Sequence, residues 1–346
     1  MNRDPGLKEI IDRLSDGWDD AQVLKMKDQL HGDLAANALF MAFKEPWRHP
    51  FNRLDSGSLH QDDGPRFWVD LTGRHESFKD DGNAHGFTIN RPGFALGLDY
   101  PLLSNGVLGA NFQYTRPRLS QETGSVRADD YELGLYGLVR FEPGFDLKAY
   151  LGYSHQNYDL RRTVSLPASP HFPAAFYEEL KGDARGDAFS ASLELTRAIE
   201  WRENIRLIPL AALDYEKASM RGFEESDGQA SLIYDRASLE RLMFRVGLGS
   251  EFTFQNGFYL KPKAQAALGL NDQKHPAVDV KFAKATLPGQ PAADIWGART
   301  GGGYLGLGLG GGSNLGGDKS FYVNYEAKIY NRATIQSGEA GFMIRW

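Results

Sequence analysis

From residue 66 to the end of the chain, hydrophobic and polar residues alternate with a period of two. In residues 131–141 one set of alternate positions holds Tyr131, Leu133, Leu135, Gly137, Val139 and Phe141, and the other holds Glu132, Gly134, Tyr136, Leu138 and Arg140. Residues 145–153 and 321–329 divide in the same way. Because successive side chains of a strand point to opposite faces, this pattern predicts β-strands with one apolar face.

The connections between these strands alternate between short and long. Tight turns rich in Gly, Asn and Pro are expected at residues 104–106, 142–144, 202–204, 255–257 and 316–318, and long polar loops at 163–187, 217–230 and 271–295. Short turns on one rim and long loops on the other are typical of outer-membrane β-barrels. The alternation alone would also suit a soluble sandwich, but the connections, together with aromatic residues at strand ends, favour the membrane barrel.

Counting the alternating segments predicts an all-β fold, a twelve-stranded antiparallel transmembrane β-barrel over residues 66–346. An even number of strands returns the last strand to the rim where the first began, as in bacterial single-chain barrels. The predicted strands are 66–78, 86–102, 106–118, 126–142, 145–162, 184–201, 204–217, 231–254, 257–270, 297–313, 319–330 and 335–346.

Residues 1–65 have a helical period and are predicted to form a separate helical segment with a linker. The first helix begins at Asp4 and Pro5, ends before Gly17, and carries an apolar stripe of Leu7, Ile10, Ile11 and Leu14. Residues 47–65, which include Pro50, Gly57 and Gly64, are interpreted as the linker to the barrel.

A second helix is predicted over residues 20–44. Asp19 and Gln22 resemble a capping box, and Pro46 must stop the helix. At 1.5 Å per residue it is roughly 37 Å long, enough to cross a bilayer. Its charged and polar residues forbid contact with lipid, so we place it in the lumen of the barrel; a surface helix on a soluble domain is the alternative for this stretch taken alone.

Composition narrows the classes of function. The 346 residues carry a formal charge of −6 with both signs interspersed, so no basic field is present for a nucleic-acid backbone. The chain has no cysteine, which excludes disulfides, cysteine metal sites and thiol chemistry. The first six residues lack the apolar core of a signal peptide, so we expect either a cytosolic chain or one whose upstream sequence has been removed.

Two apparent catalytic motifs stand at positions where they cannot act. The glycines of residues 306–311 have dinucleotide-binding spacing but lie inside an alternating strand. Ser154 and His155 are neighbours on one strand and point to opposite faces, so they cannot act as a pair. We therefore expect no enzyme activity and no cofactor or metal.

Several segments resemble one known family. Residues 340–346 place Phe342, Ile344 and Trp346 at alternate positions and end in an aromatic residue, which is similar to the outer-membrane insertion signal of bacterial barrels. Residues 26–36, followed by Phe43 and Arg53, resemble the segment that precedes autotransporter barrels, as do the strands at 97–100, near Pro209 and at 245–249. The resemblance to the autotransporter β-domain of type V secretion covers about residues 24–346. The chain departs from the family in its final Trp, where Phe is commoner, and in the absence of a long repetitive passenger before the helix.

This resemblance implies a barrel in the bacterial outer membrane that supports export of a passenger to the cell surface, with the helix left as a lumen plug. The implied partners are outer-membrane lipid and lipopolysaccharide, the barrel assembly machinery and the chain's own passenger, and we expect a monomer. The expected plug residues are Leu30, Gly32, Leu34 and Asn37. The expected lumen-facing charges are Asp70, Arg74, Asp99, Glu132, Arg140, Lys148, Arg245, Glu251 and Glu326.

Two questions stay open at this point. Some members of the family cleave their passenger at paired asparagines in the helix, whereas Asn37 stands alone here, which argues against self-cleavage. An outer-membrane porin or a barrel hydrolase is the alternative function. A porin would leave an open, constricted channel, whereas a translocator keeps the helix in the lumen.

Overall fold

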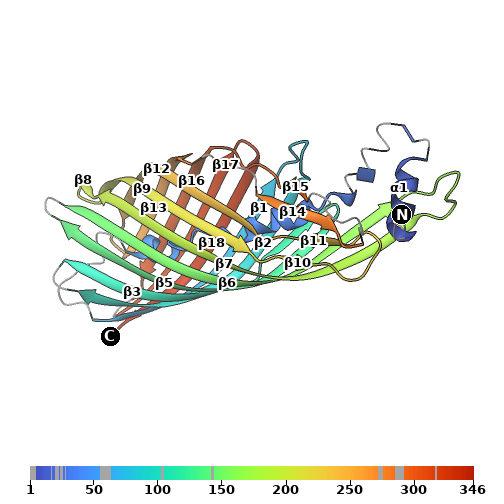
Figure 1. The fold of residues 1–346 in the computed structure, drawn as a ribbon. Helices are drawn as coiled ribbons and strands as arrows, with labels where there is room; N and C mark the ends of the chain where they lie inside the picture. Colours follow the sequence, from blue (N-terminus) through green and yellow to red (C-terminus); the bar gives the residue numbers. More distant parts are fainter. Residues whose placement is uncertain are drawn as a thin grey trace.

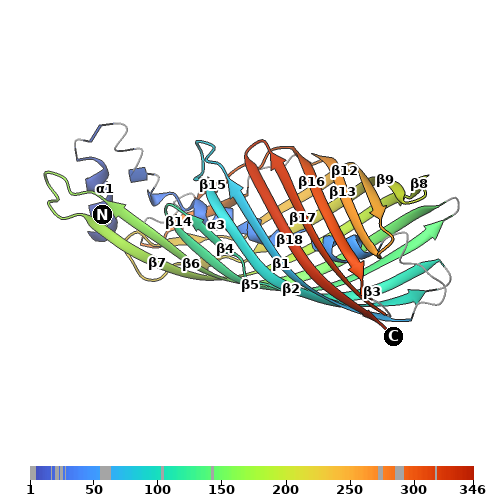
Figure 2. The same cartoon turned by 180° about the vertical axis from the view of Figure 1, so that it is seen from behind.

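The computed structural model describes residues 5–16, 18–19, 23, 26–27, 29–54, 64–102, 105–141, 144–271, 276–284, 292–315 and 318–346. These residues form one closed antiparallel barrel of twelve strand positions, as the sequence predicts. The last strand pairs with the first along thirteen residues, from Arg66 opposite Arg345 to Phe78 opposite Ala333, so the sheet has no free edge. Figures 1 and 2 show the tilted strands from two sides.

The barrel strands follow each other in chain order around the wall. β3 and β4 share one position between β2 and β5, and the short β8 continues β7 along β9. The strands are β1 (Arg66–Phe78), β2 (Phe87–Leu102), β3 (Gly106–Thr115), β4 (Arg118–Gln121), β5 (Gly124–Phe141), β6 (Phe145–Leu166), β7 (Phe176–Arg197), β8 (Ile199–Arg202), β9 (Ile205–Met220), β12 (Ala237–Thr253), β13 (Phe258–Gly269), β16 (Gly303–Asn314), β17 (Lys319–Tyr330) and β18 (Ala333–Arg345).

The two faces of the wall fall as the alternation predicts. On β5, the outward Tyr131, Leu133 and Leu135 are 43–67% exposed, whereas the inward Glu132 and Tyr136 are at most 2% exposed. β6 and β17 divide in the same way. An apolar outer surface around a charged and aromatic interior is the reverse of a soluble protein and matches a barrel that faces lipid.

The prediction of long polar loops at 163–187, 217–230 and 271–295 is largely wrong, because strands occupy parts of all three stretches. β6 and β7 stay paired as far as Leu166 opposite Phe176, beyond the rest of the barrel (Figure 1). Four short strands lie in or next to the other two stretches. They are β10 (Phe223–Glu224), β11 (Leu232–Tyr234, just before β12), β14 (Ala277–Phe282) and β15 (Ala293–Trp296). The β6–β7 extension persists because its inner face is covered by the N-terminal residues.

The first helix is confirmed as α1 (Pro5–Leu14). It lies beside the far ends of β6 and β7, at the end of the barrel opposite the C-terminus (Figures 1 and 2). Ile10 packs there in one buried cluster with Val164, Leu166 and Leu180, and Arg13 donates a hydrogen bond to the Ala174 carbonyl at 2.9 Å.

The single helix predicted over 20–44 is wrong. His31 and Gly32 are not helical, and the chain continues as α3 (Asp33–Ala38), the 3-10 helix η1 (Leu39–Ala42) and α4 (Arg48–Arg53), the last inside the predicted linker. A Cβ atom on Gly32 would lie 2.9 Å from both the Leu232 side chain and the Tyr234 hydroxyl, so the chain passes too close to the wall there for a side chain. None of the described helices is long and apolar enough to span a membrane.

Candidate functional site: the segment inside the barrel

Residues 33–54, which we call the lumen segment, occupy the interior of the barrel. α3 contacts β5, β14 and β15, while η1 contacts β9 and β12, so the segment touches strands on opposite sides of the wall. The side chains of Leu34, Leu39 and Met41 are at most 1% exposed, although a 22-residue stretch of short helices could hardly bury them alone. The segment and the wall therefore form one packed interior.

Residues 34–43 form an apolar collar with the wall. The Phe40 ring lies 5.0 Å from the Phe78 ring and 5.9 Å from the Phe87 ring, and those two wall rings stack on each other at 4.3 Å. Leu39 and Met41 belong to the same buried cluster. Close-packed aromatic and aliphatic side chains of the segment and the wall thus meet at this level of the lumen.

Asn37 is the one polar residue of the collar, and both ends of its amide are bonded. Its Nδ2 donates to Gln121 Oε1 at 2.8 Å, and its Oδ1 accepts from the Ala298 amide at 2.8 Å. An amide with both ends hydrogen-bonded can be buried at little cost, whereas loss of either bond would leave a buried polar atom without a partner.

Residues 44–53 form the ionic half of the lumen segment. Lys44 Nζ lies 2.7 Å from Asp130 and 2.8 Å from Glu132, and all three side chains are at most 1% exposed. Buried charges are costly unless opposite charges and hydrogen bonds compensate for lost hydration. Here one cation faces two carboxylates on neighbouring inward positions of β5.

The next residue carries the opposite charge. Glu45 pairs with Lys328, and the Arg241 and Arg74 guanidinium groups lie 3.6 Å and 4.0 Å from its carboxylate. Its backbone φ of 56° is in the left-handed region, directly before Pro46. This local turn lets consecutive side chains of the segment reach opposite parts of the wall.

α4 completes the ionic half. Arg48 pairs with Glu326 at 3.0 Å, and His49 Nδ1 lies 2.8 Å from Glu339 and 3.4 Å from Asp70. Arg53 pairs with Asp70 at 2.9 Å and places its guanidinium 3.3 Å from the centre of the Trp68 ring. Every charged side chain of α4 thus has an opposite charge from a barrel strand.

His49, Asp70 and Glu339 could in geometry hold a cation, because their ligand atoms lie within 4.8 Å of one another. The carboxylates are already engaged, however. Asp70 accepts hydrogen bonds from Arg53 and Tyr322, and Glu339 accepts one from Asn52 at 2.7 Å. The group is better described as part of the ion-pair network than as a metal site.

The structure brings five of the predicted lumen charges against the lumen segment. Asp70, Glu132 and Glu326 form the ion pairs above, Lys148 Nζ donates to the Phe51 carbonyl at 3.1 Å, and Arg74 donates to the Lys44 carbonyl at 3.1 Å.

The other four predicted charges pair within the wall. Asp99 accepts from Trp68 at 3.2 Å, Arg245 pairs with Asp214 at 2.9 Å, and Glu251 pairs with Arg206. Arg140, whose side chain is 30% exposed, pairs with Asp146 at 2.7 Å. An inward-facing charge in the sequence pattern therefore does not show whether its partner lies in the barrel wall or in the lumen segment.

Sequence reasoning missed several partners of the lumen segment. They share one feature: each stands at an inward position of an alternating strand, so following the alternation along every strand would have found them. The missed residues are Asp130, Glu216, Arg241, Lys328 and Glu339.

Several inward glycines make room for aromatic side chains of the wall. The space beside Gly97 is taken by the Trp68 ring and that beside Gly152 by Tyr150. Gly249 differs from them, since the nearest atom to a Cβ there would lie 3.6 Å away.

The remaining predicted residues lie in three places: the β6–β7 extension, the collar and the closing strand. Leu30 packs with the N-terminal cluster on the β6–β7 extension, whereas Leu34 is buried in the collar. On the closing strand β18, Phe342 stands opposite Val69 and Ile344 opposite Phe67, and Trp346 is 62% exposed at the chain end.

Comparison with known proteins now identifies the family. Residues 67–326 match the autotransporter beta-domain family. The chain belongs to this family. Autotransporter beta-domains are translocator barrels of the bacterial outer membrane, and this chain is one of them.

The matched proteins agree with this assignment. The chain is 28% identical over 239 residues to an extracellular serine protease of Serratia marcescens, a match that covers 67% of this chain and 22% of that protein. The chain thus spans about a fifth of the length of the curated relatives it matches.

Three solved autotransporter barrels have the same fold. The translocator domain of NalP from Neisseria meningitidis superposes with a TM-score of 0.69 at 15% identity, covering 91% of this chain and 98% of that one. The transport unit of AIDA-I from Escherichia coli gives 0.56 at 14% identity over 92% and 99%, and the beta domain of Bordetella BrkA gives 0.50 at 17% identity over 82% and 99%.

Proposed function

We propose that this barrel (residues 66–346) exports a passenger joined to the N-terminal side of the helical segment (residues 1–65), and that residues 33–54 then remain as the plug. The observation that carries this proposal is the path of the chain. It runs from α1 at the rim with the long β6–β7 extension, through the interior, to α4 near the rim with the short turns (Figure 2). Short turns face the periplasm in outer-membrane barrels, so the N-terminal side of this path is at the cell surface.

The outward face supports the proposed partners. Its apolar residues match the hydrocarbon of the membrane, with lipopolysaccharide in the outer leaflet. Phe342, Ile344 and Trp346 on the closing strand form the proposed signal for the barrel assembly machinery. No partner strand is needed for closure, because β1 and β18 already pair, and this supports a monomer.

The family is generally non-catalytic, and we propose that this chain also acts without chemistry. Ser154 is buried inside the wall, whereas His155 points outward and lies 3.0 Å from Asp187. The protease activity in the name of the Serratia relatives belongs to those proteins, of which this chain spans only a part.

A surface-display experiment tests the proposed export. An epitope is fused ahead of Met1 behind a cleavable signal peptide, and the fusion is expressed in Escherichia coli. We expect the epitope to be degraded by protease added to intact cells while the barrel keeps its heat-modifiable migration. Trp346→Asp should lower the amount of folded barrel and displayed epitope together, whereas Trp346→Phe should retain both. A folded barrel whose epitope is cut only after the outer membrane is permeabilised would contradict the proposal.

A further inference from the structure

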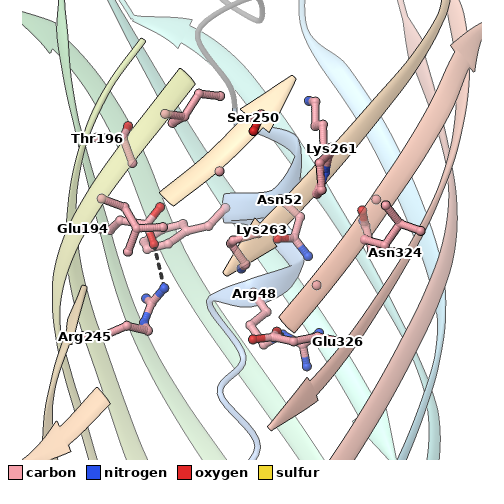
Figure 3. A pocket seen from close by; sticks show the side chains of 18 of the residues that line it. Arg48, Asn52, Glu194, Thr196, Arg245, Ser250, Lys261, Lys263, Asn324 and Glu326 are labelled. Carbon is pink, nitrogen blue, oxygen red and sulfur yellow. Dashed lines mark hydrogen bonds and ion pairs between the residues drawn. The ribbon is translucent and has the colours of Figure 1, made fainter. Parts of the chain in front are cut away.

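The lumen segment does not fill the barrel on the side of β9 to β17. Two neighbouring cavities lie between α4 and these strands, and we call them together the vestibule. Figure 3 shows residues that line the inner cavity. The inner cavity measures about 120 Å³ and the outer one about 520 Å³, and both are lined by Asn52, Lys261 and Asn324. The outer cavity reaches Arg66 and Arg345 at the ends of β1 and β18, so the vestibule opens at the rim with the short turns.

The vestibule is strongly basic although the whole chain is acidic. Ten Lys and Arg residues line the two cavities, against four Asp and Glu residues. The formal charge of the whole chain is −6. A one-sided charge inside a cavity with low-dielectric walls focuses the electric field and raises the local concentration of counter-ions.

Two lysines of β13 line the inner cavity. Lys261 lies 3.4 Å from Glu251, a carboxylate that it shares with Arg206. Within the part of the chain that the structure describes, Lys263 makes no hydrogen bond or ion pair. The two stand at alternate positions of the strand and so point to the same side, into the vestibule (Figure 3).

The wall around these lysines leaves them accessible. A Cβ on Gly249 would have no neighbour closer than 3.6 Å, and one on Gly308 none closer than 3.5 Å, where the Lys263 side chain itself lies. The outer cavity reaches the rim, whereas the collar packs against the wall beyond α4, so we take the rim as the entry for a ligand. The inner cavity measures about 120 Å³, a size that suits a small anion.

We propose that the vestibule binds small free oxyanions of the phosphate class, with Lys261 and Lys263 as the cations that attract them. This property goes beyond the proposed export function. It requires only a closed barrel with α4 in place.

The sequence contains no cysteine, so a thiol introduced by substitution is labelled without competition from a native one. Ser320→Cys places one thiol in the outer cavity, and Ser165→Cys places one on the exposed face of the β6–β7 extension. Each folded variant reacts in vesicles with an anionic and a cationic methanethiosulfonate of similar size. We expect the ratio of anionic to cationic rate at residue 320 to exceed that at residue 165 by roughly tenfold, the lower end of field focusing in charged clefts.

Substitutions and competition sharpen the test. Lys261→Gln with Lys263→Gln should bring the ratio at residue 320 close to that at residue 165, whereas Lys217→Gln, which removes a half-exposed lysine on the outer face of β9, should leave it unchanged. Millimolar inorganic phosphate should slow the anionic reagent at residue 320 only when both lysines are present. Heat-modifiable migration verifies that each variant is folded.

Three results would overturn the proposal: equal ratios at residues 320 and 165, a ratio that the double substitution does not change, or no protection by phosphate. A thiol at residue 320 that reacts with neither reagent would overturn it too, because the vestibule would then be closed at the rim. None of these results bears on whether the fused epitope reaches the cell surface, so the proposed export function stands or fails separately.

Discussion

The collar (residues 34–43) and the ionic half (residues 44–53) are consecutive parts of one segment inside one barrel, yet they contact the wall in different ways. The collar buries aliphatic and aromatic side chains, and its single polar group, Asn37, is bonded at both ends. The ionic half buries charges that each face an opposite charge of a barrel strand.

The two halves are expected to differ in how they tolerate a shift of the segment or the loss of a side chain. Apolar contacts are non-directional, so a slightly shifted collar would still seal the lumen. Buried ion pairs depend on geometry, and removing one partner leaves the other uncompensated in the interior. The ionic half therefore fixes which residue of the segment lies opposite which strand, and the collar excludes water.

The largest effect is expected in the ionic half. Lys44→Met would leave Asp130 and Glu132 buried beside each other without their cation, and we expect a loss of roughly 3 to 5 kcal/mol in the free energy of unfolding. Urea unfolding in lipid vesicles measures it. Adding Glu132→Gln to Lys44→Met should recover part of the loss, and no recovery would show that the charges are not the cause.

In the collar, Leu39→Ala removes a fully buried side chain. We expect a loss of roughly 2 to 5 kcal/mol, the range for large-to-small substitutions in packed cores. Because no charge is involved, the loss should be the same at low and high salt. A strong salt dependence of the Leu39→Ala effect would remove the distinction between the two halves.

The outward and inward faces of β6 provide a third comparison. Leu147→Arg puts a charge on the lipid face and should cost roughly 2 to 4 kcal/mol. Lys148→Arg keeps a cation beside Glu194, at 3.2 Å from the present lysine, and should cost far less. The two variants are compared by urea unfolding in vesicles. Equal stabilities would mean that the faces are assigned wrongly.

The alternation predicted these faces because a strand that divides lipid from interior must keep strict period two, and the closed twelve-strand order followed from counting such segments. It could not predict where strands end. The β6–β7 extension continues past the membrane because Val164, Leu166 and Leu180 pack on Ile10, a contact between residues over 150 positions apart in the chain.

The lumen segment was less predictable for the same reason. Its helical period was visible, but its break at Gly32 depends on Leu232 and Tyr234, and the helix α4 depends on Asp70, Glu326 and Glu339. Local propensity favoured a linker after Pro46. The ion pairs with three distant strands instead stabilise a helix there.

The smallest effect is expected outside the lumen. Arg116 and Asp129 lie 3.6 Å apart with side chains 65% and 40% exposed, so Arg116→Gln should change the free energy of unfolding by about 0 to 1 kcal/mol. This variant serves as the reference for Lys44→Met in the same urea experiment. A loss as large as that of Lys44→Met would show that exposed and buried ion pairs do not differ here.

Single-channel recording in planar bilayers tests the central claim, that residues 33–54 close the lumen of an inserted barrel. The full chain should show almost no steady current, because the collar blocks the path of ions. The double variant Phe40→Ala with Lys44→Met, which weakens both halves, should open frequently to a larger conductance. A full chain that conducts steadily, at the level of the double variant, would contradict the account and favour an open pore.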